Sequence, residues 1–115
     1  MAVGLQATAT GYAGYLASVE YAKARTQGRP VNAKDPSLPQ VAIIEHADVK
    51  RMLLAQKAYV EGALALGLYC TRLVDEQRSG TEPDGARAHL LLEVLTPIAK
   101  SWPSEWCLEA NSLAI

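Results

Sequence analysis

Apolar residues recur at helical spacing along three long stretches of the sequence, and this pattern predicts three helical regions. The first region covers residues 3 to 26, the second covers residues 47 to 78, and the third begins at residue 86. No stretch alternates apolar and polar residues as a half-buried strand would. The sequence therefore predicts an all-α fold, an antiparallel up-and-down helical bundle. The apolar stripe of the second region repeats every seven residues, at Met52, Tyr59, Leu66 and Leu73.

The first helix carries two uncharged stripes, which predicts burial on two sides, in a bundle interior or at a subunit interface. One stripe consists of larger residues: Leu5, Ala9, Tyr12, Leu16 and Val19. The other consists of small residues: Gly4, Ala7, Gly11, Gly14 and Ser18. A glycine inside a helix costs about 1 kcal/mol relative to alanine, so close approach of a neighbouring backbone is the expected compensation. A symmetric dimer would use this seam, and we expect Gly11→Leu to weaken assembly.

Loop signals separate the helical regions. Gly28 and Pro30 end the first helix, and residues 29 to 44 contain three prolines, which predicts a long surface loop of functional or docking use. The composition of residues 79 to 85 also predicts a loop. We expect a short helix over residues 86 to 95. A new helix should then start with Thr96 as its cap and Pro97 in its first position, and Pro103 should kink it.

Composition and charge limit the number of domains, the partners and the location that we expect for the protein. With 115 residues, half of them apolar, the chain is one domain at most, residues 1–115. The net charge of −1 gives no reason to expect nucleic acid as a partner. The sequence starts without a basic signal region, and no apolar run approaches the roughly 18 residues of a membrane span. We therefore expect a cytoplasmic protein with no membrane span.

Residues with metal-binding or nucleophilic chemistry are few. Cys70 and Cys107 lie far apart without a CxxC pair, so buried reduced thiols are the interpretation. His46 and His89 lack the Glu-x-x-His pairing of bundle metal sites, and we predict no metal. No Ser–His–Asp or Cys–His grouping is present. Glutamates at 105 and 109 share a helix face, which favours a solvated surface over a paired-carboxylate site.

Three segments resemble the FAD-dependent acyl-CoA dehydrogenases. The stretch TPIAKSWPSEWCLEANSLAI, residues 96 to 115, is similar to the last-but-one helix of that family, which runs into a Gly-Gly-containing flavin-binding turn. EYAKARTQGRP, residues 20 to 30, resembles a helix exit of the family, and HADVKRMLL, residues 46 to 54, resembles the start of its next long helix. The three occur in the family's order and spacing and cover nearly the whole chain.

The resemblance implies the C-terminal helical-bundle domain of an enzyme that oxidises an acyl-CoA between its α and β carbons. A carboxylate removes the α-proton and flavin N5 takes the β-hydride. An arginine at the position of Arg25 reaches the FAD pyrophosphate of a neighbouring subunit, since a guanidinium presents paired donors to anionic oxygens. Gln27 stands where the family has an aromatic residue, in a segment one residue shorter, and could still hydrogen-bond the cofactor. Arg29 completes the expected cofactor-binding set. Without the resemblance, compensation of the helix dipole explains both arginines.

The pattern of the last residues predicts that the chain is a fragment of a longer protein. No Gly, Asn, Lys, Arg or Pro follows Leu113 to end the helix, which predicts an incomplete bundle from a longer flavoenzyme. The base of this branch of the family is a Glu after the Gly-Gly turn, beyond Ile115, so no catalytic residue is assigned. We expect FAD, acyl-CoA and a dimeric or tetrameric homo-oligomer for the parent, and no flavin or turnover for the isolated chain. The alternative is a stand-alone, non-catalytic helical dimerisation module, and an open reading frame that continues on either side would distinguish the two.

Overall fold

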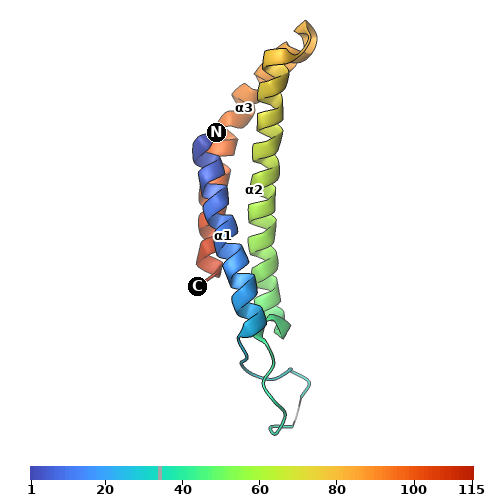
Figure 1. The fold of residues 1–115 in the computed structure, drawn as a ribbon, viewed down its shortest axis with the longest axis vertical. Coiled ribbons are helices and arrows are strands. Elements are labelled where there is room, and N and C mark those ends of the chain that lie inside the picture. Colours follow the sequence, from blue (N-terminus) through green and yellow to red (C-terminus); the bar gives the residue numbers. More distant parts are fainter. Residues whose placement is uncertain (34) are drawn as a thin grey trace.

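The chain forms three long helices joined by one long and one short connection (Figure 1). The computed structural model describes residues 1–33 and 35–115. Helix α1 spans Ala2–Ala24, α2 spans Ala47–Ser79 and α3 spans Glu82–Leu113. A short 3-10 turn, η1, spans Ile43–Glu45 inside the segment expected to be loop. No strand occurs among the described residues, so the predicted all-α fold is confirmed.

The helices alternate in direction, as the up-and-down prediction requires. In Figure 1, α1 and α3 descend side by side while α2 rises beside them. The contacts between α1 and α3 agree with this arrangement, because they pair the two helices in parallel: residue numbers rise together along both. The glycines of α1 meet α3 in three pairs: Gly4 with Ala99, Gly11 with Cys107, and Gly14 with Asn111.

The glycine stripe lies in this seam between α1 and α3. A Cβ added at Gly11 would lie 2.7 Å from Cβ of Cys107 and 3.1 Å from Cγ1 of Val60. A Cβ added at Gly4 would collide with the carbonyl oxygen of Ala99. The expected close approach of a neighbouring backbone is therefore confirmed. The expectation of a symmetric dimer through these glycines is wrong, because α3 of the same chain already fills the seam.

The third helical region differs from the prediction, because it is one helix rather than two. Helix α3 begins in the predicted loop, with Thr81 as its cap, and continues through Pro97. Proline removes only one backbone donor from a helix, and the side chains of Leu92 and Ala99 are buried on either side of it. Continuous burial against the other helices thus holds α3 together. Figure 1 shows that α3 is not straight, as expected of a helix with internal prolines.

Pro103 has a specific consequence for the seam. It has no N–H for the carbonyl of Ala99, four residues earlier, so that oxygen lacks its partner within the helix. Gly4 of α1 packs against the same oxygen. A glycine at this point lets the α1 backbone approach α3 where the proline has opened its hydrogen-bond ladder.

The buried residues form two clusters along the rod. One lies between α2 and α3 and consists of Cys70, Leu73, Ala88, Leu92 and Ala99. The other consists of Val60 and Ala63 of α2 and Cys107 and Ala110 of α3. Partly buried aromatic residues pack against it, among them Tyr12 and Tyr15 of α1, which bring the first helix into the cluster. Trp106 lies beside this second cluster, with its ring centroid 5.0 Å from that of Tyr59. The small residues at the cluster centres allow the helices to pack closely.

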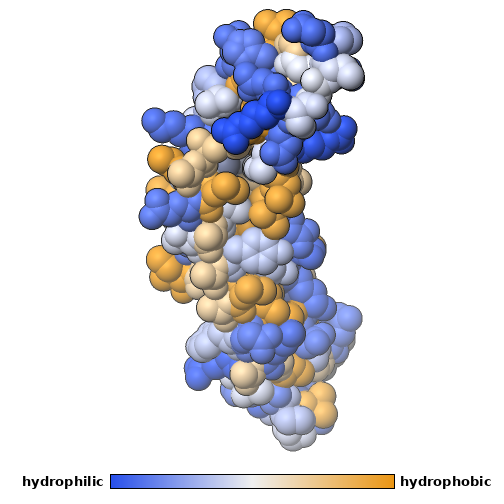
Figure 2. All heavy atoms as spheres, turned by 45° about the horizontal axis from the view of Figure 1, so that its top comes forward, coloured by the Kyte–Doolittle hydropathy of each residue, from blue (hydrophilic) through white to orange (hydrophobic). Residues whose placement is uncertain are grey.

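The molecule is elongated and leaves apolar side chains exposed. Its radius of gyration is 19.7 Å, whereas a compact domain of this length has about 13 Å. Hydrophobic side chains are scattered among polar ones over the face drawn in Figure 2. Large apolar side chains with more than half of their surface exposed include Leu16, Leu54, Leu68, Leu90, Val94 and Leu108. None of the helices in the described part of the chain is long and apolar enough to cross a bilayer.

Candidate functional site

The exit of α1 is held by a short backbone ladder that the sequence did not predict. Residues 25 to 28 run antiparallel to residues 41 to 43. The N–H of Gln27 donates to the carbonyl of Val41 at 2.9 Å, and the N–H of Val41 donates to the carbonyl of Gly28 at 3.1 Å. The N–H of Ile43 donates to the carbonyl of Arg25 at 2.8 Å. We call this paired segment the exit ladder; it places the start of α2 beside the end of α1.

Arg25 and Gln27 occupy alternate positions of the exit ladder. Arg25 ends α1 with an extended backbone, and its N–H still donates to the carbonyl of Tyr21 at 2.8 Å. Residues two apart in extended backbone project to the same side, so the guanidinium and the amide share one face. Both residues are exposed. The guanidinium of Arg25 enters none of the ion pairs found among the described residues, which leaves it free for an anion.

Arg29 is separated from this pair. Gly28 adopts a φ of +71°, which ends the extended alternation of the ladder. The Nε–H of Arg29 donates to the carbonyl of Leu38 at 2.6 Å, across the long loop. Its guanidinium is therefore partly committed to the loop itself. The structure brings Arg25 and Gln27 together and gives Arg29 a contact of its own.

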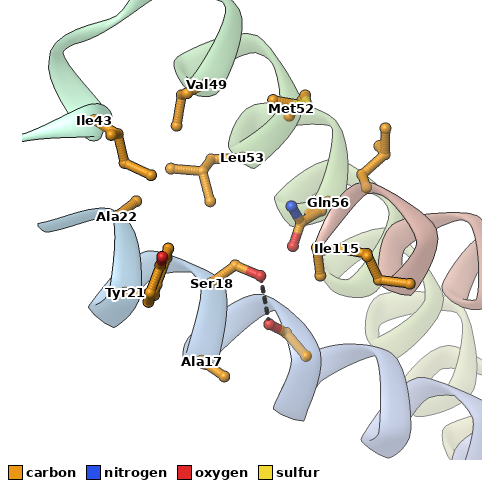
Figure 3. Close-up of a pocket in the computed structure, with 13 residues that line it drawn as sticks. Ala17, Ser18, Tyr21, Ala22, Ile43, Val49, Met52, Leu53, Gln56 and Ile115 are labelled. Atoms are coloured by element: carbon orange, nitrogen blue, oxygen red, sulfur yellow. Dashed lines mark hydrogen bonds between the residues drawn. The ribbon is translucent and has the colours of Figure 1, made fainter. Parts of the chain in front are cut away.

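A cavity of about 440 Å³ lies next to the exit ladder, between α1, α2 and the last residues of the chain (Figure 3). Ile43 belongs to both features, because its N–H is in the ladder and its side chain lines the cavity. The cavity lining contains no charged residue. Ser18 lies at its wall, and its hydroxyl is already committed to the carbonyl of Gly14 at 2.8 Å. The cavity is thus suited to an apolar group.

Gln56 places a buried amide in this largely apolar wall. Only 1% of its surface is exposed, and its Oε1 has no hydrogen-bond partner in the described part of the chain. A buried acceptor without a partner costs about 1–3 kcal/mol. Sequence reasoning missed this residue, because the heptad stripe from Met52 to Leu73 lies slightly to one side of the buried face. The fully buried positions of α2 are Gln56, Val60, Ala63, Gly67, Cys70 and Leu73.

Four glutamates lie on exposed faces of the helices, at positions 20, 61, 105 and 109. Glu20 lies 3.1 Å from the Lys23 ammonium, and Glu61 lies 2.6 Å from that of Lys57, with 45% or more of each of the four side chains exposed. The side chains at 105 and 109 are exposed, as the solvated-face interpretation predicted. The residues that the structure describes contain no cluster of three His, Cys, Asp or Glu side chains able to hold a metal ion.

Both cysteines are buried and free, which confirms the interpretation as reduced thiols. Burial raises the pKa of Cys70 and of Cys107 above the ordinary value of 9.0, because it disfavours the thiolate. A raised pKa lowers the thiolate fraction at any given pH, and the thiolate is the reactive form.

We therefore expect a thiol reagent at pH 8 to modify neither cysteine in the folded chain and both in denaturant. By linkage, the folded state holds these protons more tightly than the unfolded state, so stability should fall as the pH rises above about 9. A Cys70→Ser and Cys107→Ser double variant should lose that alkaline dependence. Rapid modification of either thiol under native conditions would contradict the burial described here.

No family model matches the chain. It is 36% identical over 114 residues to 3-methylmercaptopropionyl-CoA dehydrogenase of Ruegeria pomeroyi, an alignment of 99% of this chain and 19% of that protein. It is 39% identical over 109 residues to a broad-specificity linear acyl-CoA dehydrogenase of Mycobacterium tuberculosis, with 91% and 18% covered. A butyryl-CoA dehydrogenase of Syntrophomonas wolfei is 35% identical over 106 residues, with 90% and 17% covered.

These alignments run along almost the entire chain, and each relative is an acyl-CoA dehydrogenase by name. The chain spans less than a fifth of the length of these curated relatives. The resemblance carried by the three sequence segments is thereby confirmed: along almost its whole length the chain is similar to acyl-CoA dehydrogenases, as a fragment of such an enzyme would be.

Proposed function

We propose that the chain is part of an FAD-dependent acyl-CoA dehydrogenase and supplies bundle packing, a subunit interface and part of the flavin site. The whole enzyme would oxidise an acyl-CoA thioester between its α and β carbons. The observation that carries this proposal is the relationship to acyl-CoA dehydrogenases along nearly the whole chain. The uncommitted guanidinium of Arg25, on an ordered helix exit, supports the assignment of the flavin contact.

The residues of the exit ladder fit a phosphate-bearing cofactor. Arg25 offers a planar donor pair that suits a pyrophosphate, and no carboxylate of the described residues competes for it. Gln27 lies two positions on, so its amide would donate to a neighbouring polar atom of the same ligand. Arg29 would add positive charge at longer range while it stays bound to the loop. FAD, when bound, would accept the hydride, and these residues would only hold and orient it.

The base that removes the α-proton is proposed to lie outside this chain, in the longer protein. Glu20 of α1 and Glu61 of α2 are exposed and paired with lysines, and Glu76 of α2 is paired with Arg72. None of these carboxylates lines the apolar cavity beside the exit ladder. For this reason we assign no catalytic residue here.

A homo-oligomer, dimeric or tetrameric, is part of the same proposal. The described helices leave several large apolar side chains exposed, and such surfaces are usually covered by a partner when they are contiguous. The glycine seam is excluded as the interface, because α3 occupies it. The exposed side chains of α3, including Leu90, Val94 and Leu108, are the better candidates.

A stand-alone helical interaction module is the second candidate function, and the same exposed apolar side chains favour it. The two candidates differ in the chemistry of the longer protein. If the segment belongs to a dehydrogenase, the longer protein should reduce an electron-acceptor dye when an acyl-CoA is added, and the isolated chain should not. A reading frame that does not continue on either side, with a 115-residue chain that folds and self-associates without flavin, would favour the second candidate.

A further inference from the structure

His46 contacts the exit ladder from the opposite end of the long loop. It is the residue that precedes α2, and its ring reaches back to the end of α1. Its Nε2 lies 2.6 Å from the carbonyl oxygen of Gln27. A carbonyl only accepts hydrogen bonds, so Nε2 must carry the hydrogen. The side chain of His46 therefore donates to Gln27, nineteen residues earlier in the sequence.

This contact completes the hydrogen bonding of one peptide segment. The N–H of Gln27 is bound to the carbonyl of Val41, and its carbonyl is bound by His46. Gln27 is thus held on both of its backbone groups, from two separate segments. Arg25 lies two residues before it in the same ladder, so the anchored peptide is part of the backbone segment that carries both side chains.

Gly28 makes room for the imidazole. A Cβ added there would lie 3.2 Å from both Cε1 and Nε2 of His46, tighter than an ordinary contact. The backbone of Gly28 also has a φ of +71°, where a side chain is strained. The glycine therefore serves the turn of the chain and the seating of the ring together.

Capping of α2 does not explain the position of the His46 ring. His46 is the N-cap residue, but its side chain makes no capping hydrogen bond to the helix. The helix begins through its backbone, with the N–H of Lys50 bound to the carbonyl of His46 at 3.0 Å. The imidazole is directed away from the helix it precedes and toward the exit of α1.

From these contacts we infer that His46 is a positioning residue, whose Nε2–H fixes the Gln27 carbonyl and thereby the orientation of Arg25 and Gln27. The role of this anchoring in cofactor binding rests on the proposed function, in which Arg25 and Gln27 contact the FAD. The anchoring itself does not depend on that proposal, so each can be tested separately.

Two variants of similar size separate the donor from the packing of the ring. His46→Gln keeps an N–H donor at a reach close to that of Nε2, and His46→Met has no donor. In hydrogen–deuterium exchange of the 115-residue chain, the backbone amides of Gln27, Val41 and Ile43 should exchange about five- to tenfold faster in His46→Met. His46→Gln should restore exchange close to the original rate. Equal exchange in the original chain and in His46→Met would overturn the inference, as would a failure of His46→Gln to rescue.

The link to the cofactor is tested in the longer enzyme, because this chain supplies only part of the proposed flavin site. His46→Met should lower the flavin retained after purification severalfold, and His46→Gln should retain it close to the original level. Full flavin retention in Arg25→Ala would overturn the proposed pyrophosphate contact and leave the exchange result to decide the anchoring. Full retention in His46→Met, together with faster amide exchange, would show that the anchoring does not position Arg25.

Discussion

Replacing Gly11 with leucine is expected to destabilise the folded chain by about 3 kcal/mol, toward the upper end of the usual overpacking cost. The position faces Cβ of Cys107 at 2.7 Å and Val60 at 3.1 Å from an added Cβ, so four extra heavy atoms have no space. The gain in helix propensity over glycine, about 1 kcal/mol, is too small to offset this. Denaturant unfolding followed by circular dichroism measures the effect.

Gly62 provides the matched control for this substitution. It lies in the middle of α2, and an added Cβ would meet only the ring of Trp102 at 3.6 Å, an ordinary contact. Gly62→Ala should therefore stabilise the chain by up to about 1 kcal/mol through helix propensity alone. If Gly11→Leu weakened self-association but left the unfolding midpoint unchanged, the glycine stripe would serve an interface between chains after all.

Replacing Gln56 with methionine is expected to stabilise the chain by about 1–3 kcal/mol. The substitution removes the buried Oε1, which has no partner among the described residues, and keeps a side chain of similar length and volume. Methionine and glutamine have nearly equal helix propensities, so the change reports the cost of the buried amide. Thermal and urea unfolding of the 115-residue chain both measure it.

Gln6→Met is the control for the second prediction. Gln6 is exposed on α1, and its replacement should change the stability by less than about 0.5 kcal/mol. A stabilisation confined to Gln56→Met would show that this amide is not retained for the stability of the chain. A loss of stability at Gln56 would instead mean that the amide is satisfied in solution.

The helices could be predicted from the sequence because their apolar stripes are long and free of charge. The boundaries of α2 differ from the prediction by a single residue, at Ser79. The prediction failed at Thr96 and Pro97, where local rules favoured a new helix. Tertiary burial of Leu92 and Ala99 on both sides of Pro97 prevailed over those rules, and single-sequence patterns do not contain that information.

For the glycine stripe and for the candidate site as well, the sequence could not show which distant residues are in contact. The pattern predicted a close neighbour for Gly11, but it could not say whether that neighbour was α3 or a second chain. Arg25 and Gln27 were identified through the family resemblance. The exit ladder and its contact with His46 could not be predicted, because they link residues far apart in the sequence. Gln56 was missed because a glutamine on a helix is ordinarily read as a surface residue.

The flavin content of the longer enzyme tests the central proposal most directly. Arg25→Ala in that protein should lower the flavin retained after purification severalfold, since it removes a guanidinium that enters no ion pair among the described residues. Arg78→Ala, at the far end of α2, serves as the control and should retain a full complement. A full flavin complement in Arg25→Ala, or equal loss in both variants, would contradict the assignment of the α1 exit to the flavin site.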